Sequence, residues 1–146
     1  MLDASHDAAR PEHAAADHPK VPRAKTGVLL ANLGTPDHYT YLQLIILTKR
    51  PFTSGHAYKS IWNEEKGESP LMTITRAQTT KMAAAMQERY GDQVMVEFCM
   101  RYGNPSTKSK VRQMVEAGCT RILFFPLYPH YAGATSATAN DQFFRA

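Results

Sequence analysis

The sequence predicts an α/β fold built on a doubly wound parallel sheet. Three short apolar runs bounded by turn residues are typical of strands buried on both faces, and two segments of helical periodicity alternate with them. This alternation favours parallel strands joined by right-handed crossovers, with helices on the faces of the sheet. The chain of 146 residues suits one domain, and its hydrophobic content of 43% suffices for a core.

The predicted strands are three buried runs. The first covers residues 26–34 (TGVLLANLG) and ends at a Gly-Thr-Pro turn, and the others cover residues 93–100 (QVMVEFCM) and 121–127 (RILFFPL). In open parallel sheets the ligand binds outside the carboxyl ends of the strands. We therefore expect the functional residues to follow Leu33, Met100 and Leu127.

The longer predicted helix covers residues 69–91. Ser69 is a candidate N-cap, Pro70 suits the first helical position, and Gly91 ends the helical pattern. Its buried stripe is expected to consist of Met82, Ala85, Met86 and Tyr90.

The shorter predicted helix covers residues 104–118. Val111, Met114 and Val115 have helical spacing, and Gly118 provides a C-terminal cap. The last residues, NDQFFRA, are interpreted as an amphipathic helix that is truncated in the middle.

The first 25 residues are expected to form a disordered tail, and residues 26–146 the folded domain. The tail contains almost no large apolar side chain, so it cannot bury enough surface to offset the entropy of ordering. The role of its histidines stays open.

Composition excludes several classes of protein. The net charge of +4 is too weak and too spread out to indicate a nucleic-acid partner, and no apolar stretch approaches the roughly 18 residues of a transmembrane helix. Cys99 and Cys119 lie in or beside strands without zinc-ligand spacing, so we expect reduced core thiols. We therefore predict a cytoplasmic protein, with peripheral membrane contact possible and the oligomeric state open.

Most of the unusual side chains follow the predicted strands. No GxGxxG follows the first strand, no GxxxxGK[ST] occurs anywhere, and no nucleophilic triad has a defensible spacing. The strand ends instead offer an apolar and aromatic rim with a few polar groups, as a flat hydrophobic ligand requires. The residues of this rim are Leu33, Arg101, Tyr102, Tyr128, His130, Tyr131, Thr135 and Ser136.

Structural interpretations of these residues stand beside the functional ones. Arg101 is equally suited to cap a helix or to pair with a carboxylate, and Tyr102 to close the core. His130 suits a hydrogen-bonded structural role, and the segment GATSATANDQFF a helix start capped by Thr135 or Ser136.

At these strand ends the sequence resembles the bacterial ferrochelatases, which insert ferrous iron into protoporphyrin IX to make haem. Four segments carry the resemblance in the family's order and span almost everything from residue 26 to residue 146. They are VLLANLGTP (28–36), SGHAYKSIWNEEKGESPLMTITRAQ (54–78), VEFCMRYGNPS (96–106) and LFFPLYPHYAGATSATAND (123–141). The resemblance implies the chelatase fold of two Rossmann-like domains, of which this chain would hold an incomplete first one.

The resemblance also implies roles in porphyrin binding. Leu33 would face the porphyrin centre near the incoming metal, and Arg101 and Tyr102 would form the wall of the pocket. Tyr128 and the segments around it would line the pocket floor, and Tyr58 and Ser69 would lie near a propionate. The implied porphyrin-binding residues are Leu33, Tyr58, Ser69, Arg101, Tyr102, Tyr128, His130 and Thr135. Lys49 or Arg50 would supply a cation for a carboxylate.

The sequence departs from the family pattern at three places. The family's principal base is a histidine in an HGLP-like motif, and its second is a glutamate further along; neither motif occurs here, so no catalytic residue is assigned. Between Asp37 and Leu44 the chain has only HYTYLQ, where the family carries a few tens of residues including a helix. Gly133 stands where some ferrochelatases have a cysteine ligand, so we expect no iron–sulfur cluster.

Three hypotheses follow from these observations. The chain is a ferrochelatase by descent, with Fe²⁺ and protoporphyrin IX as substrates and no cofactor. Alternatively, it is a porphyrin-binding half-domain without a base, or a structural remnant without activity. An unpaired sheet edge would also leave apolar surface exposed, which favours association.

Overall fold

The computed structural model describes residues 24–34 and 59–146. The predicted tail up to Arg23 lies outside the described residues, as do Tyr58, Lys49 and Arg50. The predictions made for them therefore stay predictions.

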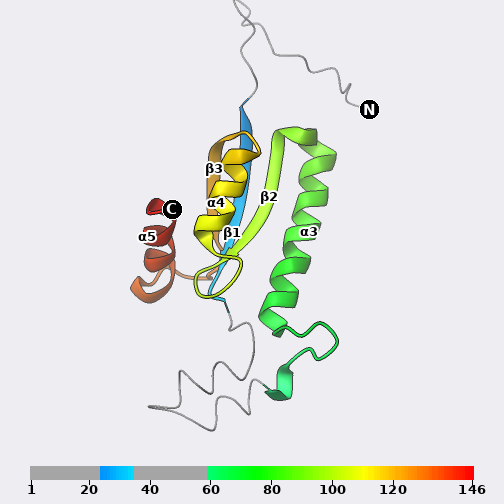
Figure 1. Ribbon diagram of the computed structural model, residues 1–146, viewed down its shortest axis with the longest axis vertical. Coiled ribbons are helices and arrows are strands. Elements are labelled where there is room, and N and C mark those ends of the chain that lie inside the picture. The colour runs from blue at the N-terminus through cyan, green and yellow to red at the C-terminus, as the bar shows by residue number, and fades with distance from the viewer. Residues whose placement is uncertain (1–23, 35–58) are drawn as a thin grey trace, which may run out of the picture.

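A parallel sheet of three strands forms the centre of the fold (Figure 1). The strands are β1 (Lys25–Asn32), β2 (Val94–Met100) and β3 (Cys119–Pro126), in the order β2-β1-β3. Leu30 of β1 pairs with Phe98 of β2 and with Phe125 of β3. All three predicted strands are confirmed, with ends that shift by one or two residues.

Helices cover both faces of this sheet (Figure 1). Helix α3 (Pro70–Tyr90) precedes β2, and the short 3-10 helix η1 (Gly91–Gln93) joins the two. Helix α4 (Thr107–Glu116) joins β2 to β3, and a π-helical turn, η2 (Gly133–Ala137), leads into α5 (Thr138–Phe144). Helix α5 ends at Phe144, and the expectation that this last helix is truncated stays a prediction.

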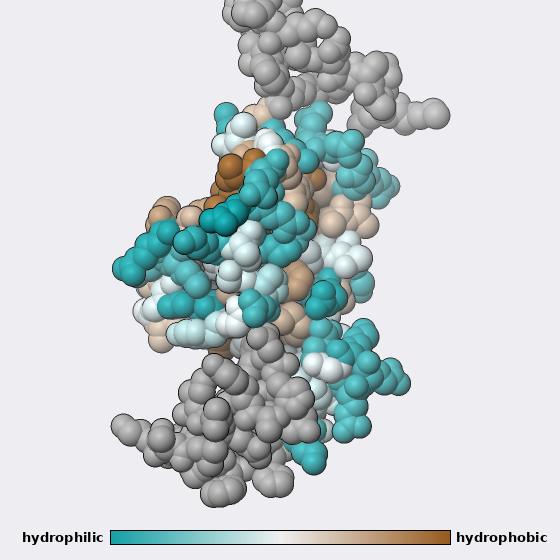
Figure 2. All heavy atoms as spheres, in the orientation of Figure 1, coloured by the Kyte–Doolittle hydropathy of each residue, from teal (hydrophilic) through white to brown (hydrophobic). Residues whose placement is uncertain are grey.

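Two hydrophobic clusters, one on each face, hold these layers together. On the α3 face the buried cluster contains Val28, Leu30, Met72, Phe98 and Met100, and on the other face it contains Leu29, Ala31, Cys99, Met114 and Cys119. Alternate residues of β1 therefore serve opposite layers, as in a strand buried on both faces. Figure 2 shows brown apolar side chains over the strands, between the teal surfaces of the helices. The doubly wound α/β prediction is confirmed.

The start of α3 follows the sequence prediction, but its buried stripe does not. Ser69 caps the helix by accepting a hydrogen bond from the Met72 backbone N–H at 3.2 Å. The buried residues are Met72, Thr75 and Thr79. Of the predicted stripe, Met82 packs partly buried against the cluster on this face, whereas Ala85 and Tyr90 are exposed. A helix of 21 residues is about 32 Å long and β2 of 7 residues about 23 Å, so the helix extends past its strand.

The buried threonines of α3 were not predicted because threonine is polar. Their hydroxyls nevertheless find hydrogen-bond acceptors within the helix. Thr75 and Thr79 donate to the carbonyl oxygens four residues earlier, each at 2.8 Å.

On α4, Met114 is buried as predicted, but Val115 is 60% exposed and faces away from the sheet. Both cysteines are free and buried, which confirms the prediction of core thiols.

Candidate functional site

The residues that follow the three strands lie together because the backbone ladder continues beyond the strand ends. The Arg101 N–H donates to the Asn32 carbonyl at 2.8 Å, and the Tyr102 N–H donates to the Leu33 carbonyl at 3.0 Å. On the other side of β1, the Leu127 N–H donates to the Ala31 carbonyl at 2.7 Å. The structure thus brings four predicted site residues together at the carboxyl ends of the strands: Leu33, Arg101, Tyr102 and Tyr128.

A glycine contact fixes the exit of β1 against the exit of β2. Gly34 has φ +91°, and a Cβ built there would lie 2.0 Å from the carbonyl oxygen of Tyr102 and 3.1 Å from Cβ of Met100. No side chain fits in this space. The sequence predicted a Gly-Thr-Pro turn at Gly34 but not this contact with the exit of β2; a glycine directly after a strand was the signal.

Asn32 is a second residue whose role the sequence analysis missed. Its side-chain amide donates to the hydroxyl of Thr75 at 3.0 Å, and its side-chain oxygen accepts from the Leu33 N–H at 2.8 Å. The first bond ties the end of β1 to helix α3, and the second orients the backbone that presents Leu33.

Arg101 and Tyr128 each bury a polar atom that has no partner among the residues that the structure describes. These atoms are Nε of Arg101 and the hydroxyl of Tyr128. The Arg101 guanidinium lies 4.6 Å from the centroid of the Tyr102 ring, which is a cation–π arrangement. Within the described ranges, Arg101 is neither paired with a carboxylate nor bonded to a helix end, so the structural alternatives for it find no support there.

The pKa of the Tyr128 phenol depends on its burial and on the neighbouring Arg101. Burial raises the pKa of its phenol above the usual 10.0, and the positive charge of Arg101 lowers it in part. The hydroxyl is therefore protonated at neutral pH and keeps a proton to donate. A buried donor without a partner costs about 1–3 kcal/mol, so this wall favours a ligand that accepts a hydrogen bond.

The rest of the wall is apolar or aromatic and faces solvent. Leu33, Tyr102 and Tyr131 are all exposed, and they lie at or just after the carboxyl ends of the strands. Such surface beside buried polar atoms matches the composition of small-molecule sites.

The loop after Tyr128 contains the remaining predicted residues. His130 is exposed, and its carbonyl accepts a hydrogen bond from the Ser136 hydroxyl at 3.4 Å. Thr135 belongs to η2, and its hydroxyl donates to the Ala132 carbonyl at 3.4 Å. The predicted helix start is confirmed, but the predicted caps are wrong. Ala132 and Ala137 occupy the cap positions because the π-helical turn shifts the register.

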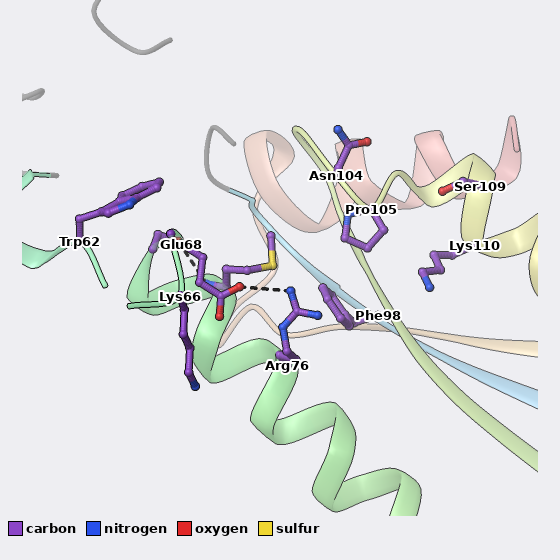
Figure 3. A pocket seen from close by; sticks show the side chains of 12 residues that line it. Trp62, Lys66, Glu68, Arg76, Phe98, Asn104, Pro105, Ser109 and Lys110 are labelled. Atoms are coloured by element: carbon purple, nitrogen blue, oxygen red, sulfur yellow. Dashed lines mark hydrogen bonds and ion pairs between the residues drawn. The ribbon is translucent and has the colours of Figure 1, made fainter. Parts of the chain in front are cut away.

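Ser69 lines a cavity of about 620 Å³, and none of the four strand-end residues lines it (Figure 3). The cavity lies between the start of α3 and the start of α4, and Pro105 borders it. In Figure 3 the Arg76 guanidinium lies between the Glu68 carboxylate and the Phe98 ring, while the Lys66 ammonium points away.

Two of the three cations that border this cavity have ion-pair partners. Arg76 pairs with Glu68 at 3.1 Å and lies 5.6 Å from the centroid of the Phe98 ring, and Lys110 pairs with Glu97 at 2.8 Å. Because these two charges are compensated and the Lys66 ammonium points away, the cavity exerts little attraction on an additional anion. Glu68 also accepts a hydrogen bond from the Thr73 hydroxyl at 2.9 Å.

Two further properties concern metals and membranes. Among residues 24–34 and 59–146, no group of three His, Cys, Asp or Glu side chains is arranged to hold a metal ion. No helix in the same ranges is both long and apolar enough to cross a bilayer.

Comparison with known sequences identifies the family of this chain. A profile of the ferrochelatase family matches residues 38–146, which is most of the chain. The chain belongs to the ferrochelatase family. It is 59% identical to the ferrochelatase of Rhodobacter capsulatus over 162 residues, which cover 92% of this chain and 46% of that protein. The ferrochelatase of Mesorhizobium japonicum is 45% identical over 168 residues, which cover 95% of this chain and 46% of the relative.

This ferrochelatase-family chain is shorter than its relatives in two respects. The chain spans a little under half of each relative. Within the aligned region, 92% of 146 residues is about 134, so about 28 of the 162 positions aligned with the Rhodobacter protein have no counterpart here. With the Brucella ovis ferrochelatase, 99% of the chain is about 145 of 172 positions, which leaves about 27.

Proposed function

We propose that this chain supplies a tetrapyrrole-binding wall of a ferrochelatase, the enzyme that inserts ferrous iron into protoporphyrin IX to form protohaem. The single observation that carries the proposal is the pair of buried polar atoms on Arg101 and Tyr128 that lack a hydrogen-bond partner in the described part of the chain. They lie beside exposed apolar and aromatic side chains at the carboxyl edge of a parallel sheet. This combination suits a flat hydrophobic ligand with polar atoms of its own.

Leu33 and Tyr102 would provide contact area for the face of the macrocycle. Both are exposed, and the backbone hydrogen bond between them holds the two segments in a fixed relation. Burying such side chains against a ligand contributes about 25 cal/mol per Å² of apolar area. We therefore assign affinity chiefly to this rim and orientation to Arg101 and Tyr128.

The other proposed contacts come from the family resemblance. Tyr128, His130 and Thr135 would line the pocket floor, and Tyr58 and Ser69 would lie near a propionate. Ser69 is a buried N-cap, so its backbone position is fixed by α3. We propose no iron–sulfur cluster, since glycine occupies position 133 and cannot be a ligand.

A second candidate function is porphyrin binding without metal insertion. Insertion of iron requires the removal of two pyrrole protons, and the family's HGLP-like motif that provides the base does not occur in these 146 residues. We assign no group of this chain to that step. Ferrous iron is a substrate here, and its insertion by these residues alone is not expected.

A fluorescence titration with protoporphyrin IX tests the binding wall. Arg101→Ala and Tyr128→Phe should each weaken binding about 5- to 30-fold, because each removes one polar group worth roughly 1–2 kcal/mol. Arg112→Ala and Tyr90→Phe, on the exposed surfaces of α4 and α3, are matched controls and should leave affinity unchanged. Equal affinity in all four variants would show that the wall is assigned wrongly.

A metallation assay separates the two candidate functions. The purified chain is incubated with protoporphyrin IX and ferrous iron or zinc, beside the complete Rhodobacter capsulatus ferrochelatase. Binding without turnover supports the second function for this chain. Turnover comparable to that of the complete relative contradicts the absence of a base.

A further inference from the structure

The loop that follows β3 is bonded to η2 and forms one unit with η2 and α5. The Ala137 N–H donates to the Ala132 carbonyl at 3.2 Å, and the Ser136 hydroxyl donates to the His130 carbonyl at 3.4 Å. Helix α5 begins directly after η2, so no further loop separates them. We call residues 128–144 the loop–α5 unit. The place of α5 on the sheet therefore determines where the loop lies.

Helix α5 contacts the sheet through apolar groups and contacts α4 through a hydrogen bond. Ala139 is buried, and the Phe143 ring stacks on the Phe124 ring of β3, with 4.5 Å between centroids and 12° between planes. The Thr107 hydroxyl of α4 donates to the Gln142 side-chain oxygen at 3.3 Å. Apolar contact tolerates sliding because it is not directional, whereas a hydrogen bond weakens steeply when its geometry changes. We therefore expect the hydrogen bond to fix the position of α5 along α4.

Thr107 is itself held in place, which makes it a suitable anchor. It is 1% exposed and follows Ser106, the N-cap of α4, whose side chain accepts from the Ser109 N–H at 3.2 Å. Its hydroxyl also lies 3.5 Å from the Cys99 sulfur of β2, two residues before Arg101. The same hydroxyl thus contacts the strand that leads to one half of the wall and the helix that follows the other half.

The hydroxyl of Thr107 has one proton, and Gln142 offers the better acceptor for it. Burial raises the pKa of the Cys99 thiol above its ordinary 9.0, so the thiol is protonated at neutral pH. A thiol sulfur is a weak acceptor, whereas an amide oxygen is a strong one. Of the two contacts of this hydroxyl, the one with α5 is therefore the stronger.

We propose that Thr107 and Gln142 are positioning residues of the tetrapyrrole-binding wall. The inference rests on the proposed function, because it concerns that same wall. Arg101 follows β2 whereas Tyr128 belongs to the loop–α5 unit, so the wall has two halves. Helices α4 and α5 lie beside each other (Figure 1), and the hydrogen bond between them sets the place of α5. Both residues act through Tyr128, and neither is assigned a contact with the ligand.

The relative position of the two halves matters because a ligand has to reach both at once. The polar atoms that await it, Nε of Arg101 and the hydroxyl of Tyr128, lie on different halves. Hydrogen bonds need about 2.7–3.2 Å between heavy atoms, so a shift of about 1 Å in one half loses a bond. A loop that is already in place also binds without the additional cost of ordering it. Removing the Thr107 hydroxyl should therefore weaken affinity without removing a group that touches the ligand.

Hydrogen exchange in the absence of ligand tests whether the contact holds the unit. Thr107→Val removes the hydroxyl and keeps the shape of the side chain, so the Ala137 amide of η2 should exchange about 2- to 10-fold faster. Thr107→Ser keeps the hydroxyl and should exchange like the native chain. Thr79→Val is the matched control, because Thr79 is also buried and donates a hydrogen bond, but within α3. It should leave exchange at Ala137 unchanged. Unchanged exchange in Thr107→Val would overturn the inference.

A titration with protoporphyrin IX tests whether the contact positions the wall. Thr107→Val and Gln142→Leu should each weaken affinity about 2- to 12-fold, the equivalent of one hydrogen bond. The double variant should bind no more weakly than the weaker single variant, because the two residues share one bond. Thr79→Val should lower the urea midpoint by a similar amount but bind like the native chain, and Thr107→Ser should keep its affinity. Native affinity in Thr107→Val, or an equal loss in Thr79→Val, would overturn the positioning role.

The two readouts separate this inference from the proposed function. A native chain that binds no protoporphyrin refutes the proposed function and the positioning role with it, and exchange at Ala137 then decides only whether Thr107 holds the loop. A native chain that binds, with variants that bind equally well, refutes the positioning role alone. Faster exchange together with weaker binding in Thr107→Val and Gln142→Leu supports both.

Discussion

Replacement of Gly34 by alanine probes the contact that joins the exits of β1 and β2. The new Cβ would lie 2.0 Å from the Tyr102 carbonyl oxygen, so these atoms must separate by more than 1 Å. The Tyr102 N–H also donates to the Leu33 carbonyl at 3.0 Å, so the two segments cannot separate without stretching this bond. Gly34→Ala is therefore expected to disturb both the fold and the proposed porphyrin-binding wall.

The magnitude follows from two contributions. A φ of +91° costs an alanine about 1–2 kcal/mol, and the loss of a partly buried backbone hydrogen bond adds about 1–3 kcal/mol. Gly118 is the matched control, because its φ is +84° but a Cβ there has nothing within 4 Å. We expect Gly118→Ala to cost about 1–2 kcal/mol and Gly34→Ala about 2–5 kcal/mol.

Urea unfolding followed by circular dichroism measures both variants, and protoporphyrin titration measures their affinity. Gly34→Ala should show the lower unfolding midpoint and the weaker binding, whereas Gly118→Ala should bind like the native chain. Equal loss of stability in the two variants would refute the steric argument, since only the shared backbone strain would remain. Normal porphyrin affinity of a folded Gly34→Ala chain would refute its link to the wall.

Other contacts give smaller effects. Thr75→Val removes the acceptor of the Asn32 amide and should lower the free energy of unfolding by about 1–2 kcal/mol in urea titration, whereas Thr80→Val, on the exposed side of α3, should cost less than half as much. Burial raises the pKa of the Cys99 thiol above its ordinary 9.0, so folding favours the protonated form. The stability this contributes is present below pH 9 and is lost as the pH rises through the folded pKa; a pH series of urea midpoints measures the loss. Rapid alkylation of Cys99 in the native chain at neutral pH would contradict its burial.

The fold was predictable because its signals are local. Ser69, Pro70 and Gly91 mark the ends of α3 by capping chemistry that depends on few neighbours. The stripe of α3 was not predictable, because the hydroxyls of Thr75 and Thr79 are satisfied by the helix itself and can face an apolar layer. Tyr90 was misjudged because helical periodicity contains no information on where the underlying strand ends.

The sequence predicted where the candidate site lies, at the carboxyl ends of the strands, but not all of its contacts. The rule that ligands bind at the carboxyl ends of parallel strands selected Leu33, Arg101 and Tyr128. The roles of Asn32 and Gly34 depend on contacts with α3 and with the exit of β2, which only the assembled fold brings near them. The place of Ser69 in a cavity that none of the four strand-end residues lines likewise follows from the packing of α3, not from any local pattern.

The wall is independent of the exposed apolar side chains of β3. The backbone hydrogen bonds that hold the wall join Ala31, Asn32 and Leu33 to the residues after β2 and β3, and none of them involves Leu123 or Phe125. Replacing Leu123 or Phe125 by serine should therefore leave porphyrin affinity unchanged, whereas Arg101→Ala should weaken it. The strand ends position the wall through these backbone hydrogen bonds, whatever covers the outer strand.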